Sequence, residues 1–113
     1  MKHIRKFNES DEVRYPKKVT QKEFFHKKSI FKMKDFSYNE KKTMCDILNE
    51  KSKKIHLSWS TSSDFIEIYR DRQFWEIVKL DDDWFTIIYT YWNTDEYYIC
   101  DEFEEVVNFL KLI

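Results

Sequence analysis

The chain contains no glycine. Glycine makes up about 7% of an average protein, so a chain of this length normally has several. Loops that cradle phosphate groups need glycine, because only a residue without a Cβ lets the backbone approach the phosphate closely. The serine elbow of many hydrolases needs glycine as well. The sequence therefore disfavours Rossmann, Walker and kinase-type nucleotide sites, and its tight turns must use Asn, Asp or Ser.

The length and composition predict one small domain. The chain has 113 residues, of which 42% are hydrophobic and 19% aromatic, enough to build a core. The basic N-terminus lacks the apolar stretch of a signal peptide, and no segment approaches the roughly 18 apolar residues of a membrane span. We therefore expect a cytoplasmic protein with an N-terminal arm over residues 1–19, anchored by Ile4 and Phe7, and a single domain over residues 20–113.

Charge is distributed unevenly along the chain. Residues 1–55 contain 16 Lys and Arg and 8 Asp and Glu, whereas residues 56–113 contain 4 and 13. The two halves therefore carry net charges of +8 and −9. Three interpretations stay open: the halves pack together and neutralise each other, the basic half contacts nucleic acid, or the acidic half docks on a basic partner.

Three segments have the spacing of a helix capping box, in which a short polar residue precedes a glutamate by three positions. The pairs are Thr20 with Glu23, Ser37 with Glu40, and Asp101 with Glu104. Apolar residues follow each pair at helical spacing. The sequence therefore predicts helices over 21–29, 38–52 and 102–112.

Between the second and third helices the pattern is that of β-strands. Apolar and polar residues alternate, and polar turns recur about every ten residues, which is typical of an antiparallel meander. The fold class predicted is α+β, a five-stranded antiparallel β-meander with two helices before it and one after it, and with the helices packed on one sheet face. The predicted strands cover 55–59, 65–70, 74–80, 84–92 and 96–100.

Several of these strands are apolar on both faces. In the strand over 84–92, one face carries Phe85, Ile87, Tyr89 and Tyr91, and Trp84, Ile88 and Trp92 point the other way. Helices cover one face, so the second face needs the N-terminal segment, a second subunit or a partner. The residues predicted as a protein interface are Trp75, Trp84, Ile88 and Trp92.

Residues 14–36 favour an alternative function, nucleic-acid binding, because they combine lysines with aromatic residues. A lysine-rich segment attracts phosphate groups without sequence preference, although few arginines are present to read base edges. This alternative predicts non-specific nucleic-acid binding. Its candidate contacts are Lys17, Lys18, Lys22, Lys27, Lys28, Lys32 and Lys34.

The sequence contains few candidate catalytic or metal-binding residues. Glu67 and Glu76 on neighbouring strands are candidates for acid–base work, and the aspartate turn at 81–83 is a candidate for a divalent cation. His3, His26 and His56 lie in no catalytic motif, and Cys45 and Cys100 form no metal-binding spacing. We therefore expect no enzyme, no cofactor and no metal site.

Three stretches suggest an origin: the opening MKHIRKFNE, the segment DDWF at 82–85 and the segment YYICDEFE at 97–104. With these the chain resembles a group of small uncharacterised proteins of tailed bacteriophages and AT-rich marine bacteria. The resemblance carries over no catalytic or binding residue. It implies a small accessory protein that binds a host or defence component. Together with the two-faced strands, it predicts a non-catalytic protein-interaction module that binds a protein partner or itself.

Overall fold

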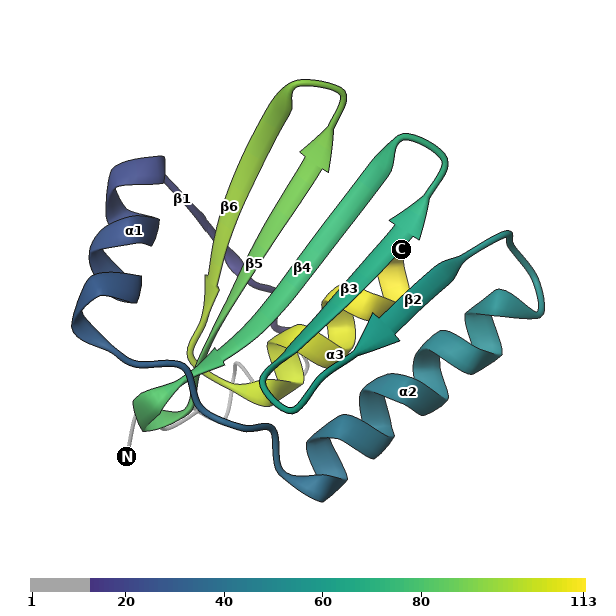
Figure 1. Cartoon of the computed structure of the whole chain (residues 1–113), viewed down its shortest axis with the longest axis horizontal. Helices are drawn as coiled ribbons and strands as arrows, with labels where there is room; N and C mark the ends of the chain where they lie inside the picture. Colours follow the sequence, from purple (N-terminus) through teal and green to yellow (C-terminus); the bar gives the residue numbers. More distant parts are fainter. Residues whose placement is uncertain (1–12) are drawn as a thin grey trace.

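The computed structural model describes residues 13–113, and the predicted anchors Ile4 and Phe7, with His3, lie outside the described residues. The fold is α+β, with three helices and one antiparallel sheet of six strands in the order β1-β6-β5-β4-β3-β2 (Figure 1). The helices are α1 (Gln21–Ile30), α2 (Tyr38–Ser52) and α3 (Phe103–Leu112). The strands are β1 (Lys17–Val19), β2 (Ser58–Thr61), β3 (Phe65–Arg70), β4 (Gln73–Leu80), β5 (Trp84–Tyr91) and β6 (Thr94–Cys100).

The fold class is as predicted, but the sheet has six strands rather than five. The additional strand is β1, in which Lys17 to Val19 pair with Ile99 to Tyr97 of β6. These three residues lie in the segment predicted as the N-terminal arm. A strand this short directly after Pro16 has no alternating pattern of its own, and it forms only because β6 offers an unpaired edge. The end of the segment predicted as an arm is therefore paired into the sheet.

The helix starts follow the capping rule. The side chains of Thr20 and Ser37 accept hydrogen bonds from the backbone N–H groups of Glu23 and Glu40, and the backbone N–H groups of Thr20 and Ser37 donate to the carboxylates of Glu23 and Glu40. The third box lies one residue later than predicted. It joins Glu102 to Glu105, whose carboxylate accepts from the Glu102 N–H.

The main core lies between one sheet face and the helices α2 and α3. Met44 and Leu48 of α2 and Val106 and Leu110 of α3 are fully buried there. Lys79 of β4 is also buried, and its ammonium donates to the Glu40 carboxylate at 2.6 Å. This ion pair ties the sheet to the start of α2. The sheet residues of this core are Ile66, Ile68, Trp75, Ile77, Phe85, Ile87 and Cys100.

The first helix lies on the opposite face, which we call the second face. Its Phe24 ring lies 5.0 Å from the ring of Tyr97, and its Lys27 ammonium lies 3.6 Å from the centre of the Trp84 ring. Tyr97 and Trp84 precede Tyr98 and Phe85, which belong to the main core. Successive side chains of a strand point to opposite faces. The expectation that all helices pack on one face is therefore wrong for α1.

Candidate interaction surface

The second face of the sheet is only partly covered. Helix α1 and the segment after it bury Val78, Leu80 and Thr86 at the end of the sheet that lies near η2 (Asp81–Asp83). Towards the hairpin tips the same face loses this cover, and its side chains become half-buried or exposed. We call this region the open half of the second face. It consists of Glu67, Tyr69, Phe74, Glu76, Ile88 and Thr90.

Aromatic and aliphatic side chains form a band across the open half. Tyr69 is 45% exposed, and its ring lies 5.0 Å from that of Phe74 on the next strand. Ile88 pairs with Tyr97 on β6, whose ring contacts Phe25 of α1 at 5.7 Å. Phe25 is itself 48% exposed. The band therefore runs from β3 across the sheet onto α1, exposed at both ends and half-buried between them, and an apolar surface of this kind is typical of an interaction site.

Two carboxylates lie within this band. Glu67 of β3 and Glu76 of β4 are directly opposite partners in the register, and both are half-buried. Within residues 13–113 neither carboxylate forms an ion pair, whereas other acidic residues of the domain do. Desolvation and the nearby charges of Glu67 and Glu76 raise the pKa of the Tyr69 hydroxyl. The open half is therefore both apolar and negatively charged.

The tips of two hairpins extend this surface at the end of the sheet. Trp92, in the β5–β6 turn, is 57% exposed and has a φ of 58°. A positive φ is unfavourable for a bulky residue, and Asn or Gly usually takes such a position. The Arg72 guanidinium of the β3–β4 turn lies 4.1 Å from the centre of the Trp92 ring. This contact holds the two tips together through a cation–π interaction.

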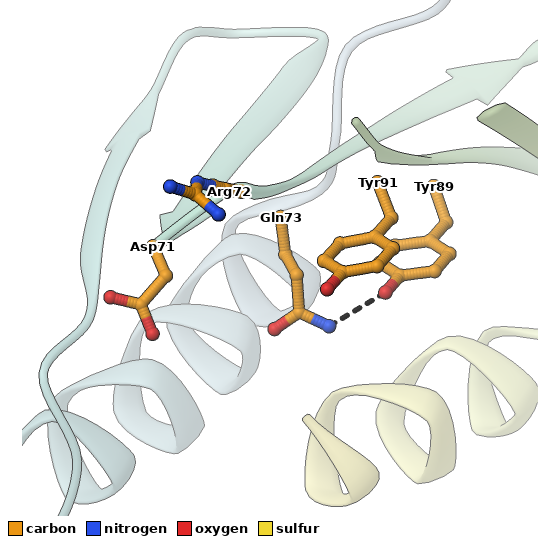
Figure 2. A pocket seen from close by; sticks show the side chains of 5 residues that line it. All are labelled: Asp71, Arg72, Gln73, Tyr89 and Tyr91. Carbon is orange, nitrogen blue, oxygen red and sulfur yellow. Dashed lines mark hydrogen bonds between the residues drawn. The ribbon is translucent and has the colours of Figure 1, made fainter. Parts of the chain in front are cut away.

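Below the tips is a hollow of about 650 Å³, lined by Asp71, Arg72, Gln73, Tyr89 and Tyr91 (Figure 2). The Gln73 amide donates a hydrogen bond to the Tyr89 hydroxyl at 2.6 Å. Gln73 and Tyr89 alternate with residues of the second face, so the hollow lies on the face that carries α2 and α3. The exposed aromatic surface therefore continues around the end of the sheet.

The structure places the four predicted interface residues in different surroundings. Trp75 is only 5% exposed and stacks on Tyr89 in the main core, so it does not lie on a surface. Trp84 is half-buried on the second face, beneath Lys27. Ile88 lies in the open half, and Trp92 lies at the hairpin tip.

Sequence reasoning missed Phe25, Tyr69 and Phe74 as surface aromatics. The signal for Tyr69 is present in the strand FIEIYR at 65–70, where Glu67 and Tyr69 alternate with the buried Ile66 and Ile68. The exposure of Phe25 has no comparable signal, because the few apolar residues of α1 do not gather on one side of the helix.

The seven predicted nucleic-acid contacts are spread over β1, α1 and the segment that follows α1. Lys18 pairs with Glu96 at 3.2 Å, and Lys34 pairs with Asp83 at 3.5 Å. Lys27 stacks on Trp84. Lys17, Lys22 and Lys32 are exposed. Part of the basic charge is thus used inside the domain, and nucleic-acid binding stays a prediction.

The aspartate turn is a short 3₁₀ segment in which Asp83 pairs with both Lys34 and Lys79. Among residues 13–113, no group of three or more His, Cys, Asp or Glu side chains is arranged to hold a metal ion. His26 and His56 are both exposed.

In the part of the chain that the structure describes, no helix has the length and apolar character that crossing a membrane requires.

A second polar cluster joins the N-terminal segment to α3. The Arg14 guanidinium donates to Glu102 at 2.8 Å and to Asp101 at 3.3 Å, and it lies 3.7 Å from Glu105. Asn108 also donates to the Arg14 carbonyl at 2.7 Å. Burial, together with the hydrogen bond and charge of Asp101, raises the pKa of Glu105 to about 8. Sequence reasoning missed this cluster, because its members are distant in the chain.

Comparisons with models of protein families, with curated proteins and with solved structures find no match for this chain.

Proposed function

We propose that the protein is a non-catalytic interaction module and that the open half of its second face is the surface that contacts a protein partner. The observation that carries this proposal is the band from Tyr69 to Phe25, which is apolar, exposed at both ends and half-buried between them, and crossed by two carboxylates that pair with no cation of residues 13–113. A folded domain gains nothing from such a surface in water, because it exposes apolar area and repels charge at once.

The chemistry of the open half specifies the partner. Apolar groups have to cover Tyr69, Phe74 and Ile88, and a cation has to approach Glu67 and Glu76. A basic surface with apolar side chains between its charges satisfies both needs. The resemblance to phage proteins points to a host or defence protein of this character, and a second copy of this chain is the other candidate partner.

The hairpin tips support the same proposal. Interfaces draw most of their binding energy from a few residues, and Trp, Tyr and Arg are the commonest of these. Trp92, Tyr91 and Arg72 are all exposed at the tips, next to the open half. Trp92 keeps an unfavourable backbone conformation without any gain in burial, which is typical of a functional position.

Affinity capture with matched variants tests this proposal. The tagged protein is incubated with nuclease-treated lysate as wild type, as the double variant Tyr69→Ala/Phe25→Ala and as the control Tyr38→Ala. Tyr38 is 78% exposed at the start of α2, outside the open half. We expect a protein that is recovered with wild type and control and lost with the double variant. Equal recovery of that protein with all three would overturn the proposal. Recovery of nucleic acid alone from untreated lysate would favour the alternative, nucleic-acid binding through the lysines.

A further inference from the structure

We infer that the partner of the open half is a second copy of this chain, bound through a two-fold axis so that α1 of each copy covers the open half of the other. This inference rests on the proposed function and names its partner. It follows from the location of the positive charge on the second face.

The basic strip that matches the open half lies on α1 of the same molecule. Lys22, Phe25 and Lys28 are spaced three residues apart, so they lie along one side of the helix. Lys22 and Phe25 are exposed, and the Lys28 ammonium lies 5.5 Å from the centre of the Phe24 ring. The strip thus presents an aromatic ring between two cations.

The open half presents the complementary pattern. Its carboxylates Glu67 and Glu76 lie beside the rings of Tyr69 and Phe74. Cations on the strip match the carboxylates, and an exposed aromatic ring on one side matches aromatic rings on the other. Each surface lacks the charge that the other supplies.

The two surfaces also meet on one face of the molecule, at the contact between Phe25 and Tyr97. When a patch and its complement lie next to each other on one face, a two-fold rotation places each on the other. The resulting interface is closed, since strip meets open half twice and both complementary surfaces are then occupied. This is the arrangement expected of a discrete dimer rather than a filament.

Charge reversal in both directions tests the inference. We expect wild type to sediment as a dimer at low salt and to shift towards monomer at high salt, because the contacts are partly ionic. Glu67→Lys/Glu76→Lys and Lys22→Glu/Lys28→Glu should each be monomeric, since each self-pairing then sets like charges against each other. The control Lys53→Glu/Lys54→Glu, which changes the same charge at the end of α2, should stay dimeric. Circular dichroism establishes that each variant is folded.

Mixing the two reversed variants is the decisive measurement. In a mixed dimer one contact is native and the other has its charges exchanged, so both are attractive, and a one-to-one heterodimer should form from two monomers. A wild type that is monomeric at every concentration, or a dimer that both reversals leave intact, would overturn the inference. A further outcome is a monomeric wild type for which affinity capture still yields a protein that is lost with Tyr69→Ala/Phe25→Ala. In that case the partner is not a second copy, and the open half is still the interaction surface.

Discussion

Glu67 on β3 and Glu76 on β4 are directly opposite each other in an antiparallel pair, in the interior of a six-stranded sheet. Like charges in this arrangement destabilise a sheet. Several other acids of the domain are paired with a cation, as Glu40 is with the buried Lys79 and Glu102 is with Arg14. Glu67 and Glu76 differ from these acids, because they oppose each other on the sheet and neither forms an ion pair within residues 13–113, and we attribute this arrangement to binding rather than to folding.

Replacing one of the two carboxylates should stabilise the isolated domain. We expect Glu76→Gln to raise the free energy of unfolding by about 0.2–1 kcal/mol, the range of a cross-strand charge interaction. The gain should shrink at high salt, because half-buried charges are still partly screened. Urea unfolding of dilute, monomeric protein measures it. Glu50→Gln, which removes an exposed carboxylate paired with Lys53, is the control and should give no gain. A loss of stability for Glu76→Gln at low salt would contradict this account of the pair.

Two tryptophans should respond to truncation in opposite ways. Trp75 lies in the main core against Tyr89, and Trp75→Ala should cost about 3–5 kcal/mol through lost burial and a cavity. Trp92 is exposed and sits at a positive φ, so Trp92→Ala should cost at most about 1 kcal/mol, the value of its contact with Arg72. Thermal unfolding of both variants compares them. Similar losses for the two would mean that Trp92 has a structural role.

Local sequence patterns predicted the local features of the fold. The capping pairs at Thr20 and Ser37 set the starts of α1 and α2, because each box needs only residues within one helical turn. The strand over 65–70 was placed correctly for a similar reason, since alternation is visible within six residues. What sequence reasoning missed depends on distant residues. Strand β1 exists through its pairing with β6, and the third capping box begins at Glu102 while the neighbouring Asp101 pairs with Arg14.

The candidate site was predicted in outline only. A partly uncovered second face follows from strands that are apolar on both sides, and Ile88 was assigned to it. It was harder to predict on which sheet face a single side chain lies. Phe74 and Trp75 are adjacent aromatic residues, and only the strand register decides which of them is buried. No sequence pattern indicated that α1 would cross to the second face and cover only half of it.

The two cysteines should differ in reactivity. Cys100 is fully buried, and burial raises the pKa of its thiol well above the ordinary value. Cys45 is half-buried on α2, and burial raises the pKa of its thiol as well, while Lys41 opposes the shift. Since only the accessible thiolate reacts, iodoacetamide at neutral pH should label Cys45 slowly and Cys100 only after unfolding. Mass spectrometry of time points measures both rates, and early labelling of Cys100 would mean that the β6–α3 junction opens in the native state.

The stability of the domain should fall as pH rises through neutrality. Glu105 is 4% exposed, and its pKa is raised to about 8, whereas an unfolded glutamate titrates near 4.5. Between these values the folded state holds one proton more than the unfolded state. The free energy of unfolding therefore decreases with pH in this window, by at most about 1.4 kcal/mol per pH unit. Glu96, whose pKa is lowered by hydrogen bonds from Tyr98 and Lys18, contributes in the opposite direction and only in acid.

The variant Glu105→Gln isolates this effect. A glutamine cannot ionise, and its amide oxygen can still accept the hydrogen bond from the Glu102 N–H that begins α3. We therefore expect Glu105→Gln to be as stable as wild type near pH 5 and more stable than wild type near pH 8. Urea unfolding at half-unit pH steps gives both curves. Parallel curves for variant and wild type from pH 5 to 8 would show that Glu105 is already ionised in the folded state, and that Arg14 rather than burial controls its charge.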